Sequence, residues 1–393
     1  QGDPMSPYLF VLGMDKLSHI ISDEIDSGKW KRKPMKAGRN GPSISHIMFA
    51  DDILLFGQAT SESMGSVIKA LQLFCSMSGQ QVNHDKSSIF FSKNVSMETR
   101  VHLVEASGFT EVSNIGKYLG VPALGRSPRR NDFQYLVEKV KAKLAGWKAQ
   151  QLSLAGRITL AKSVIQAIPI YPMLSMRIPK VCLNEIHKIR RSFIWGDNDE
   201  RRHAHLIGWQ TMTLPKSQGG MGFKDLHIMN DACLLKMNWA LLKGEHHLWG
   251  QVLLGKYGRG RNARDGVIAH QTDSVLWKAI VNLWPQLQQH VYWAVGDGQK
   301  INVWKDKWLD DKSRICDLIG SVPEDVQSWK LLDIINDQGE WNFNKLHQYV
   351  PNNTMQKIKA IVPPHANNGC DEMLWPGINM GHFTWKEYVF LCG

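Results

Sequence analysis

Two adjacent aspartates, Asp51 and Asp52, lie between two short apolar segments in the stretch SISHIMFADDILLFG, residues 43–57. Both segments are rich in Ile, Phe and Leu, so the pattern predicts a strand, a tight turn and a second strand. Two like charges side by side at a hairpin tip repel each other unless water or a cation neutralises them. The pair therefore indicates either a solvated turn, in which Asp is a favoured residue, or a site for a divalent cation.

The positive charge of the chain is concentrated in one segment. The 393 residues carry a net charge of +11, from 47 basic and 36 acidic side chains. Between Arg126 and Lys216 there are 17 Lys or Arg and 6 Asp or Glu, so this segment holds the whole excess. A surface that follows nucleic-acid phosphates has this composition, and so does a solvated helix face.

Composition excludes several other classes of protein. The six cysteines are scattered without a Cys-x-x-Cys pair, which argues against a disulfide scaffold or a complete zinc site and favours a reducing compartment. The longest apolar stretch, residues 164–174, is interrupted by Pro169 and Pro172 and is too short for a membrane span. The chain begins at Gln1 without an initiator methionine or a signal peptide, so we expect it to be part of a longer intracellular protein.

The elements around the aspartates read as helix, hairpin, helix and short strands. Ser6 is a candidate N-cap, and apolar residues at three- and four-residue spacing follow it. These residues are Phe10, Met14, Leu17 and Ile21. Residues 60–79 predict a second amphipathic helix that ends at Gly79, with Met64, Val67, Ile68, Leu71, Phe74 and Cys75 on its inner side. Residues 80–92 and 117–125 predict further short strands, so we expect an α+β fold with helices on one face of a small antiparallel sheet.

The remainder of the chain divides into a helical and a tryptophan-rich part. Residues 132–147, 154–168 and 182–195 are helix candidates, and the Pro-rich residues 168–180 predict a rigid connector. Of the 15 tryptophans, 13 lie from Trp195 onward, and we expect them to pack in a core rather than to stack on bases. Residues 291–311 predict a hairpin with its tip at 296–298.

Four motifs occur in the order found in one known family. They are QGDPMSPYLF (1–10), FADD (49–52), SGQQVNHDKS (78–87) and KYLGVP (117–122). Together they resemble the palm of reverse transcriptases of non-LTR (LINE-type) retrotransposons, especially those of plants. Residues 152–173, 193–226 and 295–309 are similar to the region that follows the polymerase in plant LINE elements. Residues 371–388 resemble the start of the family's zinc-binding reverse-transcriptase segment, before its Cys and His ligands.

The resemblance covers nearly the whole chain and implies three domains. These are the C-terminal half of a polymerase palm at 1–125, a basic, helical thumb at 126–238, and a Trp-rich mixed α/β region at 239–393. The implied activity is RNA-directed DNA polymerisation, in which deoxynucleoside triphosphates extend a DNA 3′ end on an RNA template. Two divalent ions held by carboxylates suit this phosphoryl transfer. The implied cofactor is Mg²⁺, with Mn²⁺ as an alternative, and no zinc is expected in these residues.

The resemblance also assigns roles to single residues. Asp51 and Asp52 are the implied catalytic metal ligands, with Asp51 the stronger candidate for direct coordination. Lys86 matches a lysine proposed to protonate the departing pyrophosphate, or is an ordinary turn lysine. The remaining assignments are Gln1, Gly2, Phe49 and Ala50 for the nucleotide and template, Tyr118, Leu119 and Gly120 for the primer grip, and Arg126, Arg129, Arg130, Lys141, Lys143, Arg157 and Lys162 for the nucleic-acid backbone. The insertion in VPALG relative to the usual VPLG alters the segment after Pro122.

One part of the family's active site has no counterpart in these residues. The family uses a further aspartate from a strand that precedes QGDP, and neither Asp3 nor Asp15 stands in that motif's context. We therefore expect the chain alone to be inactive in polymerisation. The alternatives are a non-catalytic remnant that still binds nucleic acid and a protein-interaction scaffold. The family implies a nuclear location, with the cytoplasm as alternative, and no membrane partner.

Overall fold

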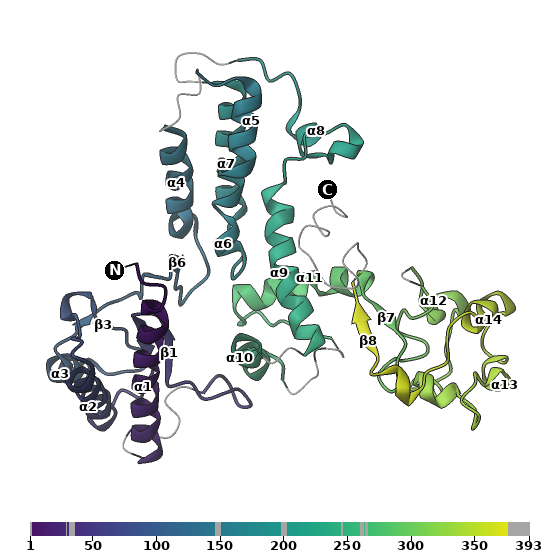
Figure 1. Cartoon of the computed structure of the whole chain (residues 1–393), viewed down its shortest axis with the longest axis horizontal. Coiled ribbons are helices and arrows are strands. Elements are labelled where there is room, and N and C mark those ends of the chain that lie inside the picture. Colours follow the sequence, from purple (N-terminus) through teal and green to yellow (C-terminus); the bar gives the residue numbers. More distant parts are fainter. Residues whose placement is uncertain are drawn as a thin grey trace. The chain divides into compact units, whose positions relative to one another are not determined.

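The computed structural model describes residues 2–28, 30, 36–145, 151–197, 203–244, 247–259, 263, 266–310 and 312–375. The chain forms two compact units (Figure 1). The first comprises Gln1–Pro128 and His246–Ser274, and the second comprises Arg129–Glu245 and Val275–Gly393. The three domains inferred from the sequence remain a prediction.

The first unit is built around two helices and a hairpin. Helix α1 (Ser6–Asp26) packs against α2 (Ser61–Ser78), and between them in sequence lies the hairpin of β1 (His46–Phe49) and β2 (Asp52–Leu55). Their shared core contains Met14, Leu17, Ile20, Ile21, Trp30, Ala70 and Phe74, which confirms the predicted buried face of α1. On α2 the fully buried positions are Ser63, Ser66, Ala70 and Phe74, so its inner face is turned slightly from the predicted one.

The ends of these helices follow local sequence signals. Thr60 caps α2 through a hydrogen bond from the Ser63 N–H, and Gly79 ends the helix in the left-handed conformation, as predicted. The predicted N-cap of α1 was wrong by one residue. The cap is Met5, and Ser6 is already helical, with Pro7 in the first turn, where its missing N–H needs no hydrogen-bond partner.

Short strands complete the first unit. They are β3 (Ser88–Ile89), β4 (Thr110–Glu111), β5 (Lys117–Tyr118) and β6 (Val121–Pro122), accompanied by the 3₁₀ turn η1 (His84–Lys86) and helices α3 (Met97–Ser107) and α10 (Leu248–Tyr257). Strands β3 and β4 are parallel, against the antiparallel prediction, because α3 carries the chain from one to the other as a crossover. Helix α10 approaches the 37–41 loop so closely that a Cβ at Gly255 would collide with Gly41.

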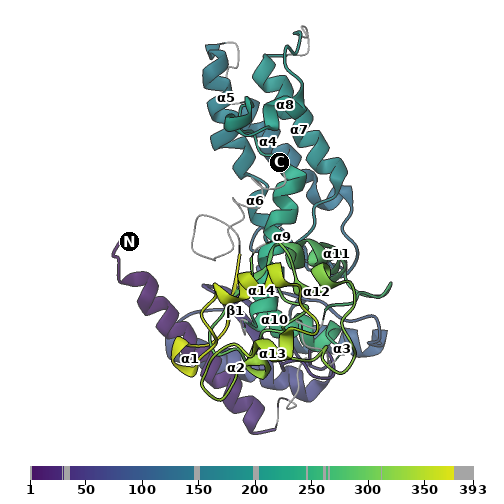
Figure 2. The ribbon, with the colours of Figure 1, turned by 90° about the vertical axis from the view of Figure 1, so that its right-hand side faces the viewer.

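The second unit begins with a helical part in which α4, α5 and α7 stand side by side in both views (Figures 1 and 2). Its elements are η2 (Arg130–Phe133), α4 (Gln134–Ala145), α5 (Leu154–Ser163), η4 (Ile165–Ala167), α6 (Ile170–Met173), α7 (Lys180–Trp195), α8 (Trp209–Thr213), η5 (Lys216–Gln218) and α9 (Leu226–Lys243). The three predicted helices correspond to α4, α5 with η4, and α7. The predicted Pro-rich connector contains the short helix α6.

The tryptophan-rich part follows α11 (Val275–His290). Its elements are β7 (Tyr292–Ala294), α12 (Ile315–Ile319), η7 (Leu331–Ile334), α13 (Phe343–Leu346), α14 (Asn352–Lys359), η8 (Ala366–Asn368) and β8 (Glu372–Leu374). Trp277, Trp304 and Trp375 are fully buried, and Trp304 and Trp308 donate their indole N–H to backbone carbonyls. These tryptophans are core residues, as predicted.

The predicted hairpin at 291–311 was wrong. Strand β7 pairs with β8, far along the chain, and the buried Asp371 carboxylate fixes the intervening turn. It accepts the N–H groups of Gly296 and Gly298, each at 2.9 Å, and that of Lys300 at 2.8 Å. A partner so distant in sequence leaves no local signal.

The described residues thus form an α+β fold, as predicted, whose four sheets have two strands each. No helix among them is long and apolar enough to cross a membrane. Residues 376–393, which include most of the segment that resembles a zinc-binding region, lie outside the described part.

Candidate active site

The two adjacent aspartates lie at the tip of a tight hairpin, which confirms the predicted strand, turn and strand. Phe49 pairs with Asp52, so Ala50 and Asp51 alone form the turn. Ala50 has a φ of 51°, which is the left-handed conformation that two-residue hairpin turns require. The strand pairing therefore fixes the backbone on both sides of Asp51.

Both carboxylates are exposed and available to a ligand. Within the described residues neither the Asp51 nor the Asp52 carboxylate takes part in a hydrogen bond or an ion pair. Other acidic side chains of the same unit are paired, as Glu111 is with Arg100. Two neighbouring carboxylates without protein partners supply the oxygen ligands that Mg²⁺ prefers, so the donor set fits that ion.

His46 holds the hairpin against α1. Its Nε2 lies 2.8 Å from the Ser18 hydroxyl, and its Nδ1 lies 2.9 Å from the Ser45 hydroxyl. Burial lowers the pKa of His46, so the imidazole is neutral at pH 7. Because side chains alternate along a strand, Met48 lies on the same inner face and packs in the core, whereas Phe49 lies on the opposite, outer face and is 61% exposed. The role of His46 was not predicted from the sequence. Its position two residues before the apolar Met48, on the same face of the predicted strand, was the signal that it points inward.

The predicted primer-grip residues form a second tight hairpin. Leu119 and Gly120 occupy its turn with φ of 49° and 79°, and β5 and β6 flank them. The Tyr118 hydroxyl is buried and has no hydrogen-bond partner among the described residues. Burial raises the pKa of Tyr118, and the negative charge of Asp52 raises it further. This hairpin thus lies within electrostatic reach of the carboxylate pair.

The other predicted site residues of the first unit are on the surface. Lys86 is exposed at the end of η1, and its ammonium has no ion pair within the described residues. Gly2 is exposed with a φ of 90°. Gln1 lies outside the described residues.

The residues predicted to bind phosphates differ in the contacts that their side chains already make within the protein. Arg130 and Lys141 contact the two oxygens of Glu185, at 2.9 and 3.5 Å. Lys143 is an exposed side chain of α4. Arg129 is exposed before η2, and Arg126, in the first unit, donates to the Ser127 carbonyl at 3.1 Å.

Two of the predicted phosphate ligands have structural contacts instead. Lys162 donates to the Met221 carbonyl and lies 4.9 Å from the centre of the Phe223 ring. Burial and the charge of Lys216 lower its pKa. The Arg157 guanidinium lies where a Cβ of residue 196 would be, so the Gly196 end of α7 accommodates it. Lys162 therefore helps to hold α5 against its neighbours, and Arg157 packs against the end of α7.

Comparison with known proteins supports the polymerase resemblance. Residues 1–123, which contain both hairpins, match the family model of the reverse transcriptase (RNA-dependent DNA polymerase). The chain is 31% identical over 267 residues to a "putative ribonuclease H protein" of Arabidopsis thaliana, a match that covers 67% of this chain and 43% of that protein. The chain thus spans less than half the length of this relative.

Two uncharacterized mitochondrial proteins of Arabidopsis thaliana are also similar. One is 26% identical over 148 residues, covering 37% of this chain and 96% of its own length. The other is 34% identical over 98 residues, covering 23% of this chain and 72% of its own length. Because residues 1–123 match the reverse transcriptase model and the similar proteins are from a plant, the chain belongs to the reverse transcriptase family, as a reverse transcriptase of plant retrotransposon type.

Proposed function

We propose that this chain is the later part of the palm, the thumb and the following region of an RNA-directed DNA polymerase of a LINE-like, non-LTR retrotransposon. Its substrates are an RNA template, a DNA primer or target end and deoxynucleoside triphosphates. The observation that carries the proposal is the pair of unpartnered carboxylates at a hairpin tip inside the region that matches the reverse transcriptase model.

In this proposal Asp51 and Asp52 hold Mg²⁺. When bound, the ion supplies charge stabilisation for the transferred phosphate and activates the attacking 3′-hydroxyl. The chain's own contribution is positional. The hairpin keeps both carboxylates on a short, fixed turn, His46 anchors that turn to α1, and Tyr118 of the β5–β6 hairpin lies within electrostatic reach of Asp52. Gln1, Gly2, Phe49 and Ala50 are the proposed nucleotide and template contacts.

The remaining proposed roles concern protons and phosphates. The exposed Lys86 ammonium is a proton donor for the departing pyrophosphate. The exposed cations of the basic segment bind backbone phosphates, which positions the duplex without reading its sequence. Among the predicted residues, Arg129 and Lys143 are the better candidates for this binding, because both are exposed, whereas Lys162 is bonded to the Met221 carbonyl and Arg157 packs against the end of α7.

Metal binding tests the proposal without requiring polymerisation. Mn²⁺ titrated into the chain and followed by electron paramagnetic resonance should show a site that Asp51→Asn weakens at least tenfold. Asp52→Asn should weaken it as well, and Asp23→Asn, which alters an exposed aspartate of α1, should leave it unchanged. Equal Mn²⁺ affinity in the wild type and Asp51→Asn would rule out the carboxylate pair as the metal site.

A second candidate function is nucleic-acid binding without catalysis, and the charge excess between Arg126 and Lys216 favours it. It predicts that duplex binding persists in a chelator and is unchanged by Asp51→Asn. The polymerase proposal predicts in addition that a deoxynucleoside triphosphate and Mn²⁺ strengthen primer–template binding in the wild type and not in Asp51→Asn. That difference separates the two functions.

A further inference from the structure

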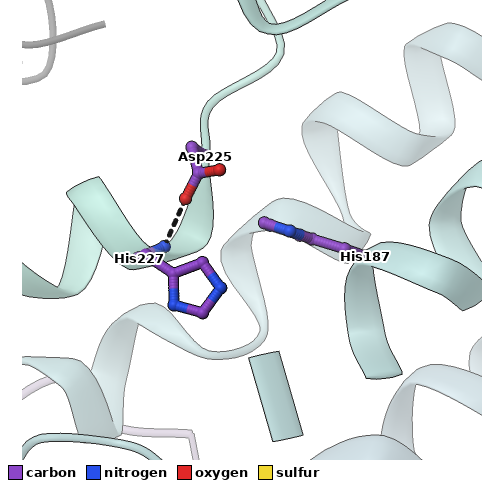
Figure 3. Close-up of side chains that lie close together, drawn as sticks. All are labelled: His187, Asp225 and His227. Atoms are coloured by element: carbon purple, nitrogen blue, oxygen red, sulfur yellow. Dashed lines mark hydrogen bonds between the residues drawn. The ribbon is translucent and has the colours of Figure 1, made fainter. Parts of the chain in front are cut away.

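A second group of possible metal ligands lies in the second unit, outside the region that matches the polymerase model. His187 belongs to α7, Asp225 is the N-cap of α9, and His227 lies in the first turn of α9. One ligand atom from each lies within 4.8 Å of the other two (Figure 3). Figure 3 shows the two imidazoles and the carboxylate converging from the two helices. No predicted function uses these residues.

The donor set is typical of a transition-metal site. Two imidazoles and one carboxylate suit Zn²⁺ and neighbouring first-row divalent ions, whereas Mg²⁺ prefers oxygen ligands alone. We propose that His187, Asp225 and His227 bind one such ion, with Zn²⁺ preferred, and so clamp α7 to the start of α9. The absence of Cys-x-x-Cys pairs does not bear on a site of this kind, because it contains no thiolate.

Each of these side chains already makes hydrogen bonds, and the ion must compete with some of them. Asp225 Oδ1 accepts the N–H groups of His227 at 2.7 Å and Ile228 at 3.4 Å. Its Oδ2 makes no hydrogen bond among the described residues, so the carboxylate can cap α9 and bind an ion at once. His187 Nε2 accepts the Leu226 N–H at 3.0 Å, and binding at that nitrogen would replace this bond.

Asn184 offers an oxygen as a fourth ligand of the site. Its Oδ1 lies 2.8 Å from His227 Nε2, one turn before His187 on α7. A small rotation would let this amide oxygen become a ligand or hold a bound water. Tetrahedral zinc needs four ligands, and the group can supply three nitrogen or carboxylate atoms and this oxygen.

The site is reachable from solvent. Asn184 and His227 line a pocket of about 230 Å³ together with Arg177, Lys180 and Asp231 among others. An ion can therefore enter from the His227 side, although His187 itself is buried. The fully buried Arg190, on the turn after His187, opposes a second cation nearby, whereas the negative charge of Asp225 attracts one. We therefore expect micromolar affinity, weaker than that of a closed structural zinc site.

Co²⁺ is the probe for this site. The 393-residue chain, without a histidine tag and stripped with a chelator, should bind one Co²⁺ at this site, recognised by the visible absorption of a nitrogen- and oxygen-ligated ion and no thiolate charge-transfer band. Zn²⁺ should displace it. His227→Ala and Asp225→Asn should each weaken binding at least tenfold. Asn at 225 retains the capping oxygen, so this variant should fold normally in circular dichroism without metal.

His205→Ala is the matched control, because His205 Nε2 also lies against a carboxylate, 2.9 Å from Asp197 Oδ2, but outside the group. It should bind Co²⁺ as the wild type does. If wild-type chain takes up no stoichiometric Co²⁺, or if His227→Ala binds it equally well, the three residues are only a helix-capping network. A thiolate band would place the ion on cysteines and overturn the assignment.

Discussion

Ala50 is the residue on which the geometry of the carboxylate pair depends most directly. Its left-handed φ of 51° costs a side chain with a Cβ about 1 kcal/mol or more, and a β-branched side chain costs more still. We expect Ala50→Ile to lower the free energy of unfolding by about 1–2 kcal/mol and Ala50→Gly to change it by less than about 1 kcal/mol. Denaturant midpoints at constant m-value measure both. Equal stability of the Ile and Gly variants would show that the turn is not held in this conformation.

The buried thiols of the α7–α9 core should be unreactive in the folded chain. Burial raises the pKa of Cys233 to about 11, and it also raises the pKa of Cys182. With a pKa near 11, about one thiol in a thousand is ionised at pH 8, and the thiolate is the reactive form. Iodoacetamide at pH 8 should therefore modify the exposed Cys370 and spare Cys182 and Cys233 until denaturant is added. Peptide mass spectrometry distinguishes the sites, and early labelling of Cys233 would contradict the packed core.

At the scale of elements, the hydrogen bond between His46 and Ser18 joins β1 to α1. A double-mutant cycle of Ser18→Ala and His46→Ala should give a coupling free energy of about 0.5–1.5 kcal/mol, the range for one hydrogen bond. Ser96→Ala removes the N-cap of α3, shares no partner with His46, and should combine additively with His46→Ala. A coupling near zero between Ser18 and His46 would mean that the core, rather than this bond, positions the hairpin.

The exposed lysines of α4 allow a test of phosphate binding by the basic segment. Lys139, Lys141 and Lys143 are all exposed, and each phosphate contact contributes about 0.9 to the slope of log K against log salt. Changing all three to Gln should lower the magnitude of that slope by up to about 3 in duplex binding. Lys162→Gln removes one positive charge, from a side chain bonded to the Met221 carbonyl, and should leave the slope unchanged, whereas each exposed lysine should contribute up to about 0.9. A larger change in slope for Lys162→Gln than for the triple variant would instead place the phosphate contacts near α5.

Sequence alone predicted the elements whose signals are local. The hairpin at Asp51, the end of α2 at Gly79 and the helices α4 and α7 follow from patterns within one element. Contacts between distant segments were not predictable in this way, such as β7 with β8 and His187 with Asp225. Counting charges along the sequence also could not distinguish Lys143 from Lys162. Lys143 is exposed, whereas Lys162 is bonded to a backbone carbonyl, and this difference exists only in the folded chain.

At the scale of the whole molecule, the question is which carboxylates polymerisation requires. The family's further aspartate has no counterpart in these 393 residues, and the candidates nearest the start of the chain have local contacts. Asp3 Oδ1 accepts the Met5 N–H at 2.8 Å, and Asp15 faces His19 on the same helix at 3.5 Å. Neither Asp3 nor Asp15 belongs to the hairpin that positions Asp51. Among the described residues, neither of these two aspartates is therefore held beside Asp51 and Asp52 as a further ligand of a two-metal site would be.

We accordingly expect the 393-residue chain to show no Mg²⁺-dependent primer extension, because alignment of the 3′-hydroxyl and the incoming phosphate supplies most of the rate in this chemistry. A longer protein that adds the preceding palm segment should extend a DNA primer on an RNA template, and Asp51→Asn in that protein should reduce extension by several orders of magnitude. Lys86→Ala should slow extension by no more than roughly 10²–10⁴-fold, which is the usual contribution of a positioned proton donor. Primer extension by the 393-residue chain that Asp51→Asn abolishes would show that Asp51 and Asp52 suffice without the further aspartate.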